Sequence, residues 1–384
     1  MYKVLNGIMG NVVVFGDSLG YNKFYLILLV IFFLGHLIFL FYRSAILMSK
    51  GRTYKEKEEE GVSVILTCAN KAELLRQNLE AFLEQDYPSF EVVVVDECSE
   101  DETQEVLSEL QKKYPHLKTS RIFPDTKFRR TKKIAINIGV LAARYDILLF
   151  SEIHCQPENQ YWIREMQSHF DANTAVVVGF SNYEPGKINL GIRRYFRFLW
   201  FWKTMLLVRC GMNVIGNGHN MGYRKKYYLE KRGFTGNTQE YIGYDSEMVK
   251  ELSRKGAVKV VKEENARVRI MDDGYKAWKD DYSYYYATKR RWPWYVGLWS
   301  NADFILEFLF YIIVLYFIIF FAFREYFIIP VILTFLTDII VINICLKRLG
   351  QRKLFLTSLT VNILGFVYKW YYSIYSIFTS KKWR

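Results

Sequence analysis

Three long apolar runs constrain this chain more than any other feature, because only lipid or a protein core can cover them. The first run, FYLILLVIFFLGHLIFLFY at residues 24–42, is long enough to cross a bilayer as a helix. It has neither a basic start nor a small-residue cleavage site, which favours an anchor over a signal peptide. We therefore expect an N-terminal segment, residues 1–48, with its membrane span at about residues 24–43.

The second and third runs lie near the other end of the chain, at residues 303–323 and 327–346. A short polar link at 324–326 separates them, which predicts a helical hairpin within a C-terminal membrane region, residues 303–384. A further stretch, residues 354–378, contains a lysine and is followed by more basic residues. It predicts either another span or a helix that lies along the interface, and both alternatives stay open.

Basic residues beside these runs predict the orientation of the chain. By the positive-inside rule they place residues 50–300 and the loop 347–353 in the cytoplasm, and the link 324–326 on the other side. The basic residues are Arg43, Lys50, Arg52 and Lys55 after the first run, and Lys347, Arg348, Arg352 and Lys353 after the third.

Composition excludes several classes of protein. Lys+Arg number 52 against 39 Asp+Glu, so the net charge of +13 predicts an anionic partner, either a membrane surface or a polyanionic substrate. We expect no nucleic-acid partner. The five cysteines are scattered without a CxxC pair, which argues against a disulfide framework or a cysteine-rich zinc site.

Between the membrane segments, short apolar strands alternate with helical patterns. Buried strands are predicted at residues 62–68 (VSVILTC), 91–96 (EVVVVD), 146–151 (DILLFS) and 175–180 (AVVVGF), and helices at 71–85, 101–114, 131–144 and 159–170. This alternation predicts an α/β fold: a mainly parallel, Rossmann-like sheet with helices on both faces. Ligands of such sheets bind at the carboxyl ends of the strands. No GxGxxG or GxxxxGK[ST] follows these strands, so neither a dinucleotide fingerprint nor a P-loop is present.

A series of motifs over residues 60–295 resembles the family 2 glycosyltransferases with a GT-A fold, and the flanking apolar runs resemble the membrane-bound branch of that family. The resemblance implies a cytoplasmic, inverting enzyme with a nucleotide-diphospho-sugar donor and a lipid-linked or polysaccharide acceptor. The motifs are VSVILTCANKAELL, EVVVVDECSEDET, KKIAINIGVLAA, DILLFSEIHCQP, GNGHNMGYRK, GYDSEMVKEL and KRRW.

The strand ends at 62–68 and 91–96 carry the expected nucleotide contacts. The resemblance implies that Asp96 hydrogen-bonds the base or ribose, with Thr67, Asn70 and Glu97 beside it. The family pattern is Asp-Asp-x-Ser, so Glu97 departs from it by one methylene. The alternative is a structural role, in which strand-end residues such as Ser99 or Asp101 cap the helix that follows.

The lysine pair at the start of the helix at 131–144 opposes the helix dipole, so helix stability does not explain it. A helix N-terminus with lysines suits an anion, and the resemblance implies that Lys132, which aligns better than Lys133, reaches the donor phosphates. A solvated basic loop, Arg129 to Lys133, is the alternative.

The strand at 146–151 ends in Glu152-Ile153-His154, where the family has Asp-x-Asp holding Mg²⁺ or Mn²⁺. Hard cations prefer oxygen ligands, and an imidazole binds Mg²⁺ poorly. Three readings stay open: Glu152 and His154 hold a cation, with Mn²⁺ favoured over Mg²⁺; His154 contacts the diphosphate directly without a metal; or the site is degenerate. We expect a retained divalent-cation site with altered metal dependence.

Asp245 carries the catalytic hypothesis. The family has an acid pair here, whose aspartate acts as general base on the acceptor hydroxyl; this chain has Tyr244-Asp245. The resemblance also puts Asn220 and Tyr244 on the acceptor side. The alternative is that an acid in the first turn of a helix only stabilises the helix dipole.

Arg291 and Trp292 match the Arg-Trp of the family's Gln-x-x-Arg-Trp motif, which implies contact with the diphosphate and the acceptor. Thr288 replaces the glutamine, which puts processive synthesis in doubt. The alternative is an interfacial belt of Trp and basic residues. Residues 191–208 predict another aromatic and basic helix, expected on the membrane face.

These observations predict a membrane-bound, inverting glycosyltransferase. The alternative is a catalytically silent GT-A relative that binds a nucleotide or a partner synthase at the membrane. The departures at Glu152-Ile153-His154, at Tyr244 and at Thr288 favour that alternative.

Overall fold

The computed structural model describes residues 2–49, 59–123, 131–184, 191–238, 240, 242–320 and 327–379. Some residues on which the expected orientation and anion site depend lie outside these ranges: Lys50, Arg52, Lys55, Arg129 and the link 324–326.

A seven-stranded sheet forms the centre of the soluble part, in the order β3-β2-β1-β4-β8-β6-β9. Its strands are β1 (Val62–Cys68), β2 (Phe90–Asp96), β3 (Leu117–Arg121), β4 (Ile147–Phe150), β6 (Thr174–Gly179), β8 (Met221–Arg224) and β9 (Ala257–Val261). Only β8 runs antiparallel, to both β4 and β6, and the other pairs are parallel. A smaller sheet of β5 (Cys155–Pro157), β10 (Val268–Ile270) and β7 (Ser181–Tyr183) lies beside it.

Helices cover both faces of the main sheet, because alternate residues of its strands point to opposite sides. In β1, Val64 and Leu66 pack into one core with Leu75, whereas Ile65 packs into a second core with Val140. The helices of the first face are α2 (Ala72–Asn78), α3 (Glu80–Leu83), α4 (Thr103–Lys113) and α6 (Trp162–Ser168). Those of the second face are α5 (Lys132–Ala142), α8 (Lys225–Glu230) and α9 (Tyr244–Leu252).

The expected α/β class and the mainly parallel sheet are confirmed. One predicted helix differs: residues 71–85 form two short helices, α2 and α3, that break at Leu79. At this break Asn78 is buried and donates from its side-chain amide to the carbonyl of Ile153, 2.9 Å away. The bond ties the end of α2 to the loop after β4.

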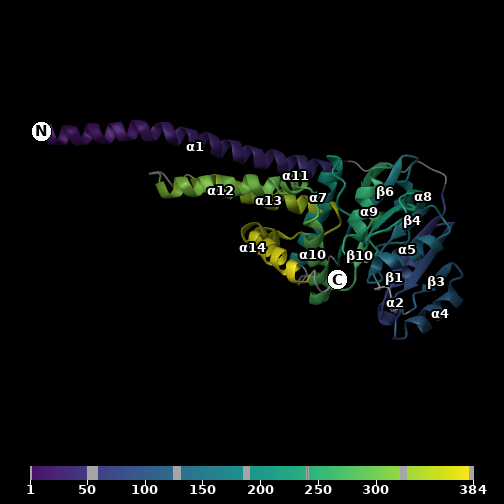
Figure 1. The fold of residues 1–384 in the computed structure, drawn as a ribbon. Helices are drawn as coiled ribbons and strands as arrows, with labels where there is room; N and C mark the ends of the chain where they lie inside the picture. Colours follow the sequence, from purple (N-terminus) through teal and green to yellow (C-terminus); the bar gives the residue numbers. More distant parts are fainter. Residues whose placement is uncertain are drawn as a thin grey trace.

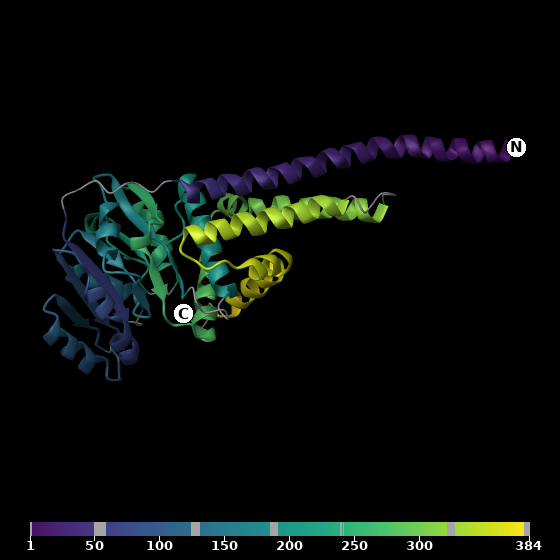
Figure 2. The same ribbon diagram turned by 180° about the vertical axis from the view of Figure 1, so that it is seen from behind.

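A bundle of long helices extends from the soluble part (Figures 1 and 2), and both views show α1, α12 and α13 side by side. The helices on this side of the molecule are α1 (Tyr2–Met48), α7 (Gly191–Arg209), α10 (Tyr275–Lys289), α11 (Trp294–Ser300), α12 (Ala302–Phe320), α13 (Ile328–Arg348) and α14 (Phe355–Thr379).

Two of these helices are long and apolar enough to cross a membrane, at residues 23–48 and 328–348. A third span is present if α11 and α12, which bend by 61° at their junction, count as one. The first and third predicted runs are therefore confirmed as helices of spanning length, and the second is part of the bent pair. Helix α14 forms and packs against α10, but its placement in or along the membrane stays a prediction.

Helix α7 differs from the expectation that it would lie on the membrane face. Most of its side chains are buried, since it packs between the sheets and helices α1 and α14. Trp202 of α7 donates its indole N–H to the carbonyl of Arg43 in α1, 3.0 Å away. The ammonium group of Lys262, just after β9, also donates to the carbonyls of Ile46, Leu47 and Ser49 at the end of α1. These bonds satisfy carbonyls that a helix end leaves open, and they join the first membrane helix to the sheet.

Candidate functional site

Asp96 ends β2, and its carboxylate is fully buried. One oxygen accepts from the backbone N–H and the hydroxyl of Ser99, at 2.9 and 2.5 Å. The other accepts from the Gln104 amide and lies 3.5 Å from Nε of Arg121. Both oxygens therefore hold the loop after β2, and the expected nucleotide contact of Asp96 stays a prediction.

Asn70 and Thr67 tie the ends of β1 and β2 together. Asn70 has a φ of 52°, in the left-handed region, and its side-chain oxygen accepts from the N–H of Glu100 at 2.8 Å. Thr67 hydrogen-bonds the carboxylate of Glu97. Burial raises the pKa of Glu97, although the positive charge of Lys132 acts to lower it. Glu97, rather than Asp96, is thus the acid of this loop that interacts with Lys132.

The two lysines at the start of α5 point to different places. Thr131 caps the helix, since its hydroxyl oxygen accepts from the N–H of Ile134. Lys132 pairs with Glu152, whereas Lys133 is fully buried and pairs with Glu247 at 2.8 Å. Lys133 therefore belongs to the core beneath the helix, and Lys132 reaches a pocket at the strand ends.

A pocket of about 330 Å³ opens beyond the carboxyl ends of β1 and β4. Its basic side chains are Lys71 and Lys132, and its imidazoles are His154 and His219. Its acids come from three regions: Glu152 after β4, Asp245 in α9, and Asp272, Asp280 and Asp281 in and before α10. The pocket thus combines cations for an anionic ligand with carboxylates that can accept protons.

Glu152 faces this pocket from the end of β4. One oxygen accepts from the ammonium group of Lys132 and from the hydroxyl of Tyr244, the latter at 2.7 Å. Burial opposes ionisation of Glu152, but the charge of Lys132 and these hydrogen bonds hold its pKa below the usual value. Glu152 is therefore an ionised group whose charge a lysine already compensates.

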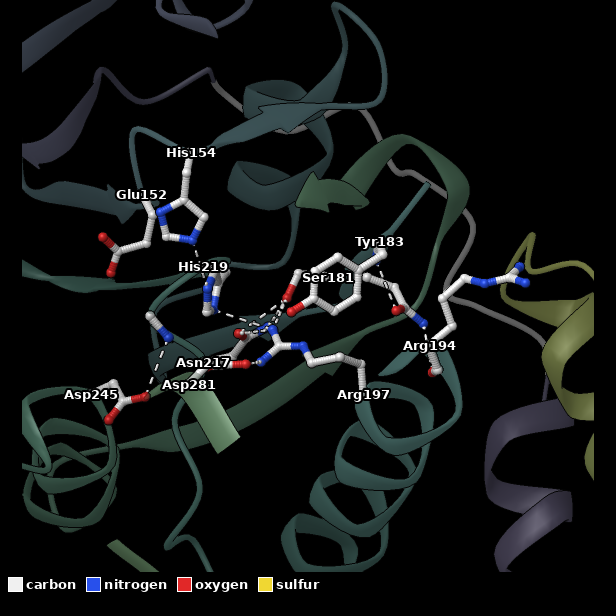
Figure 3. A network of polar contacts seen from close by, with 12 residues as sticks. Glu152, His154, Ser181, Tyr183, Arg194, Arg197, Asn217, His219, Asp245 and Asp281 are labelled. Carbon is white, nitrogen blue, oxygen red and sulfur yellow. Dashed lines mark hydrogen bonds and ion pairs between the residues drawn. The ribbon is translucent and has the colours of Figure 1, made fainter. Parts of the chain in front are cut away.

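His154 lies between Glu152 and His219 (Figure 3), and its Nε2 atom is 3.2 Å from Nε2 of His219. Nδ1 of His219 in turn lies 3.2 Å from a guanidinium nitrogen of Arg197. Burial lowers the pKa of His154, and burial together with the charge of Arg197 lowers the pKa of His219 well below its usual value. Both rings are therefore neutral near pH 7.

Arg197 of α7 is the buried centre of this network (Figure 3). It pairs with Asp281 at 3.1 Å, and its other terminal nitrogen donates to Ser181 at 2.5 Å and to Asn217 and His219, each at 3.2 Å. Burial raises the pKa of Asp281, although the charge of Arg197 opposes that shift. The guanidinium is thus fixed by four partners from three other segments of the chain.

Asp245 lies in the first turn of α9 and is buried. One oxygen accepts from the N–H of Ser246 at 2.7 Å and the hydroxyl of Tyr284 at 2.9 Å, and the other from the N–H of Gly218 at 3.3 Å. Gly243, which precedes the helix, has a φ of 83°, so the turn needs a residue that tolerates the left-handed region. These contacts fix the carboxylate at the edge of the pocket.

The two residues expected on the acceptor side lie in different parts of the structure. Tyr244 lines the pocket and bonds to Glu152. Asn220 is fully buried; its side-chain nitrogen donates to the carbonyls of Phe180 and Ala266, and its oxygen accepts from Trp162. All of its polar atoms are used within the core, so the structure does not bring Asn220 to the pocket.

Arg291 and Trp292 line a different, smaller cavity of about 190 Å³ on the other side of the start of α9. Arg291 pairs with Glu240 at 2.6 Å, and the ring of Trp292 packs edge-on against Tyr285. The structure thus separates these two residues from the pocket that holds Glu152.

The residues at the end of β4 fit a divalent cation poorly. Among the described residues, one group near the pocket brings potential ligand atoms within 4.8 Å of one another: His154, Cys155 and His219. Burial raises the pKa of Cys155 well above its usual value, so the metal-free site holds a neutral thiol there. A metal-bound histidine normally donates its second N–H to an acceptor, whereas the second nitrogen of His219 faces Arg197, which only donates.

Four functional residues were not predicted from sequence. His219, Asp281 and Tyr284 line the pocket, and Arg197 contacts the first two. His219 stands inside the GNGHN motif, which was the only local signal for it. The other three lie in α7 and α10, whose aromatic sequences indicate helices at a membrane and do not indicate a site. Their presence depends on how these helices pack across the sheet edge.

Comparison with known proteins gives the family of the sheet domain. Residues 63–230 match the family model described as glycosyl transferase family 2. A dolichyl N-acetyl-alpha-D-glucosaminyl phosphate 3-beta-D-2,3-diacetamido-2,3-dideoxy-beta-D-glucuronosyltransferase of Methanococcus voltae is 26% identical over 197 residues, 50% of this chain and 54% of that protein. A poly-beta-1,6-N-acetyl-D-glucosamine synthase of Staphylococcus epidermidis is 28% identical over 95 residues, 25% of this chain and 22% of that protein. The chain thus spans only part of the length of these curated relatives.

A solved structure shares the fold. It is the mannosyltransferase PcManGT from Pyrobaculum calidifontis in complex with GDP-Man and Mn²⁺, with a TM-score of 0.55 and 15% sequence identity over 88% of this chain and 97% of that one. A divalent cation is therefore compatible with this fold in general. The sheet order, the strand-end pocket and these matches agree: residues 63–230 of this chain belong to a glycosyltransferase family 2 domain with the GT-A fold.

Proposed function

We propose that the chain is a membrane-bound, inverting glycosyltransferase. It moves a sugar from a nucleotide-diphospho-sugar donor to a hydroxyl group of a lipid-linked glycan or polysaccharide. One observation carries the proposal: a fixed carboxylate, Asp245, and a lysine, Lys132, line the same pocket at the carboxyl edge of a parallel sheet. An inverting transfer needs a base for the acceptor and positive charge for the leaving group.

In the proposed reaction Asp245 accepts the proton of the acceptor hydroxyl while that oxygen attacks the anomeric carbon of the donor sugar. The bond between that carbon and the diphosphate breaks, and its electron pair leaves with the nucleoside diphosphate. A single displacement inverts the configuration. Lys132 and Lys71 stabilise the charge that develops on the diphosphate, since both line the pocket.

The nature of the acceptor is supported by the relatives and by the helices. The named relatives include a poly-beta-1,6-N-acetyl-D-glucosamine synthase and a transferase named for a dolichyl N-acetyl-alpha-D-glucosaminyl phosphate. Helix α7 connects the site to the membrane helices, because Arg197 is in the pocket network and Trp202 contacts α1. We propose that the acceptor arrives from the membrane, with residues 60–295 as the cytoplasmic catalytic domain at the cell membrane.

No step of this mechanism uses a bound divalent cation. If an ion is held, its ligands would be Glu152 and His154, and the imidazole would favour Mn²⁺ over Mg²⁺. Both expected ligands are already engaged, since the carboxylate pairs with Lys132 and the imidazole contacts His219.

The test uses purified full-length protein in detergent. A panel of UDP- and GDP-sugars is screened for release of the nucleoside diphosphate, and binding of UDP and GDP is measured by calorimetry. Lys132→Ala is expected to weaken nucleotide binding about tenfold or more, because it removes a charged hydrogen bond. The control, Lys112→Ala, removes the same charge from an exposed position on α4.

The outcomes separate the proposal from its alternative. Donor turnover together with a selective loss in Lys132→Ala supports the transferase. Nucleotide binding without turnover of any donor would favour the catalytically silent relative. Equal affinity in wild type, Lys132→Ala and Lys112→Ala would remove Lys132 from the donor site.

A further inference from the structure

The hydrogen bonds around the two pocket histidines determine which of their nitrogens carry protons. A guanidinium has donors only, so Nδ1 of His219, which faces Arg197, must supply a lone pair. A neutral imidazole has one N–H, and in His219 that N–H is therefore at Nε2. A ring with a proton on both nitrogens would point an N–H at the guanidinium of Arg197, so the contact itself requires a neutral His219.

The same reasoning determines which nitrogen of His154 carries the proton. Nε2 of His219 lies 3.2 Å from Nε2 of His154, so His219 donates and His154 accepts. The proton of neutral His154 is then at Nδ1. Among the described residues Nδ1 of His154 has no hydrogen-bond partner, and the side chain lines the pocket beside Lys132. His154 therefore presents an N–H to the pocket.

This arrangement is the opposite of what a metal ligand needs. Binding a cation through Nδ1 requires a lone pair there, which would put a proton on Nε2 against the N–H of His219. Binding through Nε2 requires His219 to give up its hydrogen bond to His154. Glu152, the other expected ligand, has its charge compensated by Lys132.

We propose that His154 binds the donor diphosphate as a neutral hydrogen-bond donor, in a tautomer that Arg197 sets through His219, and that no divalent cation is held at this strand end. The inference rests on the proposed function, since it names the group that the pocket holds. His154 and Lys132 then share the diphosphate oxygens, while His219 and Arg197 act through His154 as positioning residues.

The test measures nucleotide affinity rather than turnover. UDP and GDP are titrated into the purified full-length protein by calorimetry, in excess EDTA and again in excess Mn²⁺. Wild type is expected to bind the preferred nucleotide equally well in both. His154→Ala is expected to lose about tenfold or more in EDTA, because a hydrogen bond to a charged group is removed.

A matched pair of variants tests the tautomer. Glutamine at position 219 can still donate to His154, whereas glutamate of the same length can only accept. His219→Gln should therefore lose less affinity in EDTA than His219→Glu. His219→Glu should also recover affinity in Mn²⁺, since His154 is then free to offer a lone pair at Nδ1 beside Glu152.

Each other outcome has a definite meaning. The inference would be overturned if wild-type protein needed Mn²⁺ to bind the nucleotide. It would also be overturned if wild-type protein without nucleotide removed the electron paramagnetic resonance signal of free Mn²⁺ stoichiometrically. Both measurements use wild-type protein, so neither depends on the folding of a variant. Equal losses in His219→Gln and His219→Glu would remove the tautomer argument. Failure of UDP and GDP to bind under any condition would instead overturn the proposed function.

Discussion

Replacing Asp245 by asparagine keeps the shape of the side chain and removes its basicity. Asparagine retains one oxygen, which can still accept from Ser246 and Tyr284 at the present 2.7 and 2.9 Å. Its amide then faces the N–H of Gly218, now 3.3 Å from the second oxygen, and that hydrogen bond is lost. The structural cost is about 1 kcal/mol, the typical net value of one hydrogen bond.

The expected effect on catalysis is much larger. A general base contributes about 10²–10⁴-fold to a rate, so Asp245→Asn should reduce kcat by that factor. Nucleotide affinity should not fall, because the change removes negative charge from a pocket for an anion. The loss should therefore appear in kcat and leave the protein folded.

The assay follows release of the nucleoside diphosphate from the donor sugar that the wild-type protein turns over, with calorimetry for affinity and a thermal melt for stability. Glu109→Gln on α4 is the control, since it neutralises an exposed carboxylate away from the pocket. A variant Asp245→Asn that keeps more than a tenth of the wild-type kcat would show that another group, such as Asp280 or Asp281 of the same pocket, is the base.

Three further predictions concern stability and orientation. Burial opposes ionisation of Glu91, but an ion pair and two hydrogen bonds hold its pKa below the usual value. The stability that ionised Glu91 contributes is therefore present above the unfolded pKa of about 4.3 and is lost as pH falls. Glu91→Gln should lower the free energy of unfolding by about 1–3 kcal/mol at pH 7 and by little at pH 3, measured by denaturant titration. An impermeant thiol reagent should label Glu325→Cys in intact cells and spare Arg352→Cys, and the reverse pattern would refute the orientation. His36 and Asp338 form a buried pair at 3.0 Å between α1 and α13, so His36→Ala should destabilise the protein by about 3 kcal/mol in thermal melts, and the double variant with Asp338→Ala should recover part of that loss.

Arg352 suits this labelling test better than its neighbour Gln351, and the reason is structural. Both positions belong to the same loop in the sequence, and charge alone does not distinguish them as labelling sites. Gln351 is 4% exposed, so a cysteine there would escape the reagent on either side of the membrane. Arg352 is exposed, so only the membrane can protect it.

The sequence predicted four strands of the main sheet, β1, β2, β4 and β6, and the apolar helices, because each signal is local; β3, β8 and β9 were not predicted. Short apolar runs in the sequence predict β1, β2, β4 and β6, and the helical patterns between these runs predict a mainly parallel sheet. The strand-end position of Glu152 and the first-turn position of Asp245 follow in the same way, since they depend only on where an element ends or begins.

The use of each side chain was decided only by the tertiary structure. Asp96 and Lys133 have the same local signals as Glu152 and Lys132, yet Lys133 pairs with Glu247 within the core. The carboxylate of Asp96 is used by Ser99 of its own loop and by Arg121 of β3. Arg197 reaches His219, which lines the pocket, because α7 packs across the sheet edge. Hydrogen bonds between residues far apart in the chain determine which polar atoms are left to bind a ligand. Local sequence patterns do not give the distances between such residues.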